Sequence, residues 1–209
     1  MVKNSEIFNE KAKRRTFGLH LTSIDIFYKY IFPEIKNCLN DYLWVDLYAG
    51  DGNLILPILD RIPRVDRQDF FLNHIYLFDV QEEMVQKCIK NTEKYGIPEE
   101  FTTKNILKRD NLKTYPKILK KQKFPIFHIT NPPYLYLGYI KKHKETQQYL
   151  TYFEKENEGY QDLYQIAMMN DLRNNIENLI YIVPTNLLYG ASVSNKFRLD
   201  FLKRYKITK

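Results

Sequence analysis

Short apolar runs that predict strands alternate with helical patterns along this 209-residue chain. Five runs stand out, at Leu43–Leu47, Ile75–Phe78, Phe101–Ile106 (the weakest), Pro125–Thr130 and Leu179–Val183. Strands that alternate with helices are typical of an open, mostly parallel sheet with helices on both faces. The sequence therefore predicts an α/β fold, and sheets of this kind bind ligands beyond the carboxyl ends of their strands.

Three helices are predicted between or before these strands. Gln81–Tyr95 places its apolar residues on one face, and Gly96 is a sound stop after it. Asp162–Arg173 also carries a single apolar stripe.

The third predicted helix lies near the start of the chain. Apolar residues recur at helical spacing from Leu21 to Ile35. Thr22 and Asp25 have the T-x-x-D spacing of a capping box, and Pro33 is expected to disturb or end this helix.

Composition excludes several classes of protein. Apolar residues make up 44% and charged residues 27% of the chain, as in soluble globular proteins. No apolar run approaches the ~18 residues of a membrane span, and the polar first residues do not resemble a secretory signal. Cys38 and Cys88 lie in apolar stretches and are expected to be buried thiols, so we expect a cytoplasmic protein. The net charge of +7 raises the odds of a polyanionic partner.

A glycine turn follows the first predicted strand. Gly50 and Gly52 flank Asp51, and glycine permits both a sharp turn and the close approach of a ligand. Ile55 occupies the third glycine position of the dinucleotide fingerprint, which disfavours a dehydrogenase. Asp46 places a carboxylate near the turn, where a cationic ligand group could bind.

Asp79 ends the second predicted strand, where a carboxylate can accept hydrogen bonds from ribose hydroxyls. It follows Gly52 by 27 residues, more than the ~20 usual for nucleotide-binding units, and we interpret the polar stretch Arg61–Asn73 as a long loop. Each element alone is equally consistent with an ordinary turn and a surface aspartate. Together they favour an adenosine-containing ligand.

The tetrapeptide Asn131-Pro132-Pro133-Tyr134 follows the fourth predicted strand. The two prolines make a rigid segment. The side-chain oxygen of Asn131 and the carbonyl of Pro132 can both accept hydrogen bonds, which suits one NH2 group. Tyr134 offers a flat face on which a base can stack. A strand-ending turn is the simpler interpretation of Asn-Pro alone, but the tetrapeptide follows the two elements above at a strand end of the same sheet.

These motifs, in this order, resemble the gamma group of N6-adenine DNA methyltransferases of bacterial restriction-modification systems. The resemblance covers nearly the whole chain, and Gln161–Tyr164 and Leu179–Pro184 resemble later motifs. It implies a Rossmann-like class I methyltransferase fold that binds S-adenosylmethionine and DNA, with no metal. The cofactor-binding residues that it implies are Phe17, Gly18, Thr22, Asp46, Tyr48, Gly50, Gly52, Asp79, Val80, Asn105 and Ile106, and the catalytic ones are Asn131, Pro132, Pro133 and Tyr134.

The implied reaction is methylation of the N6 amino group of an adenine flipped out of the duplex. Asn131 and Pro132 would accept hydrogen bonds from N6 while Tyr134 stacks on the base. The amine would then attack the sulfonium methyl group in line, with no general base.

The chain departs from the family at three points. Ser23 stands where the family often has proline. Asn105 stands where the third cofactor motif usually has aspartate, and Asp110 is a second candidate for that contact. The chain ends before the family's last strands and target-recognition domain. We therefore expect residues 1–40 to be an N-terminal segment with the cofactor motif, and 41–209 to be an incomplete catalytic core whose recognition part lies in a partner subunit or a missing C-terminal domain.

Other functions stay open. Methyltransferases of protein glutamine and of guanine N2 in RNA have a similar glycine turn and tetrapeptide, although the segment of residues 17–23 favours the DNA group. Enzymes that methylate cytosine N4 more often have serine or aspartate at the position of Asn131. A non-catalytic module of a larger DNA-modifying complex is the alternative from a different class.

Overall fold

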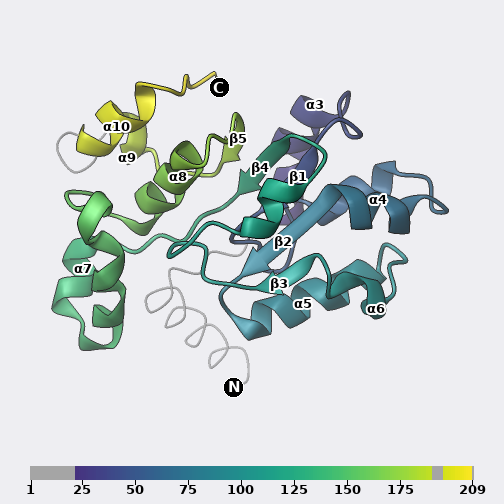
Figure 1. The fold of residues 1–209 in the computed structure, drawn as a ribbon, viewed down its shortest axis with the longest axis horizontal. Coiled ribbons are helices and arrows are strands. Elements are labelled where there is room, and N and C mark those ends of the chain that lie inside the picture. The colour runs from purple at the N-terminus through teal and green to yellow at the C-terminus, as the bar shows by residue number, and fades with distance from the viewer. Residues whose placement is uncertain (1–21, 190–194, 209) are drawn as a thin grey trace. The chain divides into compact units, whose positions relative to one another are not determined.

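The computed structural model describes residues 22–189 and 195–208, which form two compact units (Figure 1). The sheet unit comprises residues 22–131 and Ile176–Ile182. The helical unit comprises residues 132–175, 183–189 and 195–208. Phe17 and Gly18, two predicted cofactor contacts, lie outside the described residues.

All five described strands form one parallel sheet with the order β3-β2-β1-β4-β5. They are β1 (Leu43–Asp46), β2 (Ile75–Asp79), β3 (Ile106–Lys108), β4 (Ile126–Thr130) and β5 (Asn178–Tyr181). The chain runs outward from β1 through β2 to β3 and then crosses to the other side of β1 for β4 and β5. This order confirms the predicted α/β, Rossmann-like fold and puts its topological switch point between β1 and β4.

Helices pack on the sheet because successive side chains of a strand point to opposite faces. On one face, Trp44, Leu77 and Ile129 join a core completed by the helices of the sheet unit. Val45 and Phe78 face the other way and pack with Leu119. The helices of the sheet unit are α2 (Ile24–Ile26), η1 (Phe27–Ile31), α3 (Phe32–Ile35), η2 (Leu56–Arg61), α4 (Arg67–His74), α5 (Glu82–Glu93), α6 (Glu99–Thr102) and η3 (Lys117–Lys121).

The described part of the helical unit contains no strand. Its elements are α7 (Leu137–Lys142), η4 (Lys144–Phe153), η5 (Lys155–Asn157), α8 (Leu163–Arg173), α9 (Asn186–Tyr189) and α10 (Asn195–Leu202). Aromatic rings hold it together, since Tyr164 and Phe201 both pack against the buried ring of Phe197.

The predicted helices α5 and α8 and four of the five predicted strands are confirmed. The prediction of a strand over 101–106 is wrong, because α6 occupies its first residues and β3 begins only at Ile106. The prediction of a loop over 61–73 is also wrong. Helix α4 lies there and buries Phe70 and Phe71, an apolar pair that its polar neighbours conceal in the sequence. The glycine turn leads into the 3-10 helix η2.

The first helix differs from its prediction at both ends. Ser23 is its N-cap, and the Ser23 hydroxyl oxygen accepts from the backbone N–H of Asp25 at 3.3 Å. Pro33 does not end the helix. The π-helical turn η1 precedes it, and this wider turn accommodates a residue that has no backbone N–H to donate.

Within residues 22–189 and 195–208, no helix is both long and apolar enough to cross a membrane.

Candidate functional site

The carboxyl ends of β1 and β4 meet at the switch point of the sheet. Asp46 ends β1 and Thr130 ends β4. The Thr130 hydroxyl donates to Oδ1 of Asp46 at 2.5 Å, and the backbone N–H of Tyr48 donates to the same oxygen at 2.9 Å. This places a carboxylate, only 1% exposed, at the point where sheets of this class bind ligands.

The buried position of Asp46 changes its acidity. Burial raises the pKa of Asp46 to about 7, because a carboxylate loses its hydration there. His128 and the hydrogen bonds from Thr130 and Tyr48 favour the ionised form and oppose this rise, whereas the nearby charge of Asp79 adds to it. A positive charge next to Asp46 would favour its ionised form and lower this pKa again.

Asp79 joins the end of β2 to the glycine turn. Its Oδ2 accepts from the backbone N–H of Gly50 at 2.9 Å, and its Oδ1 accepts from that of Gln81 at 2.8 Å. Burial raises the pKa of Asp79 as well, although these two N–H groups oppose the rise. Each carboxylate oxygen can accept more than one hydrogen bond, so the contacts leave acceptor capacity for hydroxyl groups such as those of a ribose.

The backbone conformation and the packing around position 52 both require glycine there. Its φ of +85° lies in the left-handed region. A Cβ atom at this position would lie 2.6 Å from Cδ1 of Leu56 and 2.8 Å from Sγ of Cys88. The prediction that glycine leaves room here for a ligand is therefore corrected for Gly52, because the side chains of Leu56 and Cys88 occupy the space beside its Cα atom. Gly50 also has a positive φ, +56°.

Replacing Gly52 with alanine should destabilise the protein by about 2–4 kcal/mol, from backbone strain and overpacking together. Gly96 is the matched control, since its φ is +83° but a Cβ there would meet only Nε of Arg64, at 3.9 Å. Gly96→Ala should therefore cost only the backbone part, about 1–2 kcal/mol. Urea unfolding measures both variants, and equal losses would show that the contacts with Leu56 and Cys88 do not constrain Gly52.

Thr22 connects the glycine turn to the tetrapeptide. The Asn131 side-chain amide donates from Nδ2 to Oγ1 of Thr22 at 2.9 Å. The Asn53 amide donates to the backbone carbonyl of Thr22, also at 2.9 Å. Thr22 therefore holds two asparagines that lie 78 residues apart in the sequence, and its hydroxyl binds Asn131 instead of capping the first helix.

Sequence reasoning missed Thr130, Asn53 and Asn91. The Asn91 amide donates to the backbone carbonyl of Asp51 at 2.8 Å and so fixes the turn from α5. Thr130 and Asn53 directly neighbour predicted site residues, which is the only signal that the sequence offers for them. Their partners are distant in sequence, so no local pattern reveals these contacts.

The prediction for Asn105 needs correction, whereas that for Ile106 stays a prediction. Asn105 directly precedes β3, and the buried Ile106 begins this strand and pairs with Leu77. The Asn105 amide is buried and donates to the backbone carbonyls of Phe71, Leu72 and Ile75. It therefore ties α4 to β2. Asp110, the second candidate, follows the carboxyl end of β3, and its Oδ1 accepts from the backbone N–H groups of the next turn.

Two further predicted residues lie near the carboxyl edge, within two residues of a strand end. Tyr48 follows β1 and is half-buried, and Val80 follows β2 and is exposed. The predicted site residues that the structure brings together are thus Thr22, Asp46, Gly50, Asp79 and Asn131, whose contacts run between the ends of β1, β2 and β4.

Pro132, Pro133 and Tyr134 belong to the helical unit, so the unit boundary falls within the tetrapeptide. The Tyr134 ring lies 6.0 Å from that of Tyr164, centroid to centroid. Next along the chain, the backbone N–H of Leu135 donates to Oδ1 of Asp162 at 3.0 Å. Burial raises the pKa of Asp162 to about 6.

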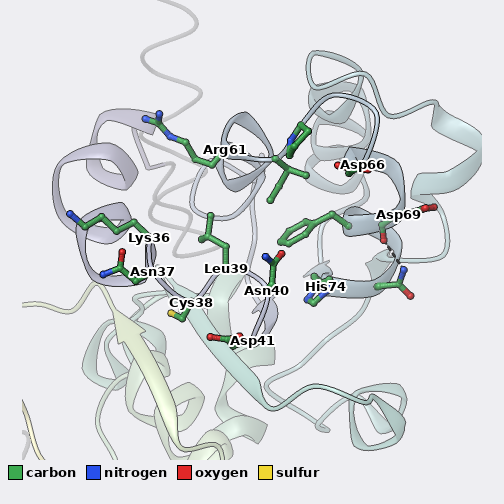
Figure 2. A pocket seen from close by; sticks show the side chains of 14 residues that line it. Lys36, Asn37, Cys38, Leu39, Asn40, Asp41, Arg61, Asp66, Asp69 and His74 are labelled. Carbon is green, nitrogen blue, oxygen red and sulfur yellow. Dashed lines mark hydrogen bonds between the residues drawn. The ribbon is translucent and has the colours of Figure 1, made fainter.

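A cavity of about 650 Å³ lies at the opposite, amino edge of the sheet (Figure 2). Residues before β1, such as Asn40 and Asp41, line it together with Asp66, Asp69 and His74 from α4 and the residue before it. None of the predicted site residues lies there. Among the described residues, no three His, Cys, Asp or Glu side chains are grouped so that they could hold a metal ion.

Comparisons with known proteins support the fold and give no information on the site. No protein-family model matches the sequence, and no curated protein matches it. The chain is similar to a solved structure described as "cryoEM structure DrdV-DNA complex", with a TM-score of 0.66 and 12% sequence identity. The match covers 94% of this chain and 23% of that chain. At this identity the similarity shows that the two proteins share a fold, and this chain spans about a quarter of the other one's length.

Proposed function

We propose that this protein transfers a methyl group from S-adenosylmethionine to the N6 amino group of adenine in DNA. One observation carries the proposal: the hydrogen bond from Asn131 to Thr22 joins the tetrapeptide to the glycine turn and its two buried carboxylates. A methyl donor and a methyl acceptor must lie in contact, so the residues for each must be adjacent. The net charge of +7 and the similarity in fold to a protein in a DNA complex support DNA as the substrate.

The residues of the sheet unit fit this cofactor by their chemistry. When bound, S-adenosylmethionine supplies a methyl group on a positively charged sulfur. Asp46, buried with a pKa of about 7, would offer its negative charge to the cationic methionine end. Asp79 would accept hydrogen bonds from the ribose hydroxyls, and its contact with Gly50 already orients its carboxylate.

The tetrapeptide would prepare the amine. Asn131 donates from Nδ2 to Thr22, which turns its carbonyl oxygen to the other side of the side chain. That oxygen and the Pro132 carbonyl would accept the two N6 protons, and Tyr134 would stack on the flipped base. Accepting both protons draws the nitrogen toward tetrahedral geometry and frees its lone pair for attack. Positioning would provide most of the rate.

The first test separates cofactor binding from methyl transfer. Calorimetric titration with S-adenosylmethionine should show binding that Asp79→Ala weakens about tenfold to a hundredfold, since a charged hydrogen bond contributes about 1.5–3 kcal/mol. Asp69→Ala removes an exposed carboxylate that lines the amino-edge cavity, so it should leave the affinity unchanged. Equal affinity for Asp79→Ala and the wild type would contradict the cofactor site.

The second test identifies the substrate. Methyl transfer from labelled S-adenosylmethionine should give N6-methyladenine in duplex DNA of mixed sequence, read by mass spectrometry of the nucleosides. Label that enters only RNA or protein glutamine would replace the DNA assignment with one of the alternative substrates. Cofactor binding with no transfer to any of them would identify a non-catalytic module.

A further inference from the structure

Tyr136 is an exposed aromatic residue two positions after the tetrapeptide. Its side chain is 45% exposed, and within the described part of the chain it forms no aromatic pair. A single exposed tyrosine is common on protein surfaces, so exposure alone implies nothing. The position of this ring, however, depends on Gly138, two residues further along the chain.

Gly138 leaves the space in which the Tyr136 ring lies. A Cβ atom on Gly138 would collide with Cε1 of Tyr136 and would lie 3.1 Å from Cδ1 and 3.2 Å from Cζ. One side of the ring, from Cδ1 to Cζ, therefore lies directly beside Gly138 in the first turn of α7. Glycine is a poorer helix former than alanine, so Gly138 leaves room for this ring at some cost to the stability of α7.

The backbone under the ring is held on both sides. Tyr136 forms an antiparallel bridge with Asp162, and the N–H of Leu137 donates to the carbonyl of Gln161 at 2.8 Å. The carbonyl of Tyr136 accepts from the N–H of Ile140 at 3.1 Å, and Ile140 is fully buried. An aromatic ring on such a fixed backbone can stack on a base with little loss of conformational entropy.

Three lysines follow the ring, two at the end of α7 and one at the start of η4. Lys141, Lys142 and Lys144 are exposed, and none of them pairs with a carboxylate among the residues that the structure describes. No acidic residue occurs between Tyr136 and Lys144. The next one, Glu145, lies 3.6 Å from His143. The segment 136–144 thus combines an exposed ring with three positive charges that no carboxylate of the described residues pairs with.

We propose that Tyr136 and these three lysines form a contact for single-stranded DNA, in which the ring stacks on an unpaired base and the lysines bind neighbouring phosphates. From Tyr136 to Lys142 the chain rises by about 9 Å along α7, at ~1.5 Å per residue. Stacked nucleotides in one strand are ~3.4 Å apart, so the contact spans about two to three of them. The inference rests on the proposed function, because flipping an adenine out of the duplex leaves its partner base unpaired.

The test measures the affinity for a fluorescent single-stranded oligonucleotide in the absence of cofactor. Tyr136→Ala should weaken binding about tenfold to a hundredfold, and Tyr136→Phe should retain wild-type affinity because stacking needs only the ring. Tyr30→Ala, which removes an exposed tyrosine of η1, is the control and should change nothing. Equal affinity for Tyr136→Ala and the wild type would overturn the proposal, as would a wild type that binds no DNA.

Gly138→Ala separates the position of the ring from the stability of the fold. Alanine favours the helix, so the melting temperature should stay the same or rise, yet its Cβ displaces the ring and should reduce DNA affinity. Unchanged affinity in this variant would contradict the proposed position of the ring.

Replacing the three lysines with glutamine tests the phosphate contacts. The slope of log affinity against log salt concentration should become less steep by about 2. An unchanged slope would show that these lysines do not bind phosphates.

The two proposals fail in different ways. A protein that binds DNA through Tyr136 but transfers no methyl group contradicts the proposed function alone. A protein that methylates DNA, and whose Tyr136→Ala variant binds DNA like the wild type, contradicts this inference alone.

Discussion

Asp46→Asn is expected to be more stable than the wild type at pH 8 by about 4 kcal/mol, and equally stable at pH 4. The folded pKa of Asp46 is about 7, whereas that of an unfolded aspartate is about 3.9. Between these values the folded state binds a proton that the unfolded state has released, so stability falls as pH rises from about 4 to about 7. A difference of about three pKa units corresponds to ~4 kcal/mol.

Asparagine removes this dependence because it cannot ionise. Its side-chain oxygen can still accept from the Thr130 hydroxyl and the Tyr48 N–H. The measurement is the urea midpoint of both proteins from pH 4 to pH 8. Asp66→Asn, an exposed aspartate before α4, is the control and should follow the wild type. A constant difference between Asp46→Asn and the wild type across this range would contradict the buried, protonated carboxylic acid.

Asp46→Asn should stabilise the fold but lower the affinity for the proposed cofactor. A cationic ligand favours the ionised form of Asp46, so the affinity of the wild type should rise with pH up to about 7, and binding near neutral pH should release a proton. Asp46→Asn should bind more weakly with no such dependence. A gain in stability together with a loss of affinity would indicate that the carboxylate is retained for a ligand at the expense of the fold.

Asn131→Ala is expected to lower the rate constant of methyl transfer by about 10²–10³-fold, the usual effect of removing one preorganised hydrogen-bonding group from a reaction site. Affinity for S-adenosylmethionine should change little, because the buried carboxylates that would hold it remain. Single-turnover transfer to duplex DNA measures the rate, and calorimetry measures the affinity. A variant with near wild-type rate would contradict the role proposed for Asn131.

Thr22 provides a control for the position of Asn131. Thr22→Val removes the hydroxyl that accepts from Asn131 and should lower the rate by a smaller factor. Thr22→Ser keeps a hydroxyl and should restore the rate, which a purely structural role of the methyl group would not allow. This comparison tests Thr22 as a positioning residue.

The predictions that the structure confirms depend on local patterns. The apolar runs at Leu43–Leu47 and Ile75–Phe78 became β1 and β2, and the amphipathic Gln81–Tyr95 became α5. Asp79 could be placed at a strand end because it directly follows such a run, and Asp46 could be placed near the glycine turn because it lies four residues before Gly50. The loop predicted over 61–73 failed because two buried phenylalanines among polar residues do not make a clear helical period.

The sequence by itself determined that this chain forms an α/β sheet and which polar residues end its strands, since hydrophobic periodicity and glycine act over a few residues. Only the tertiary structure decided which of these ends meet. The crossing from β3 to β4 brings Thr130 to Asp46, 84 residues away in sequence, and Asn131 to Thr22, 109 residues away. Tertiary packing also directs the Asn105 amide to the backbone carbonyls of Phe71, Leu72 and Ile75, and fills the space beside Gly52 with Leu56 and Cys88. Such contacts depend on strand order and on packing between distant segments, which no local spacing of residues encodes.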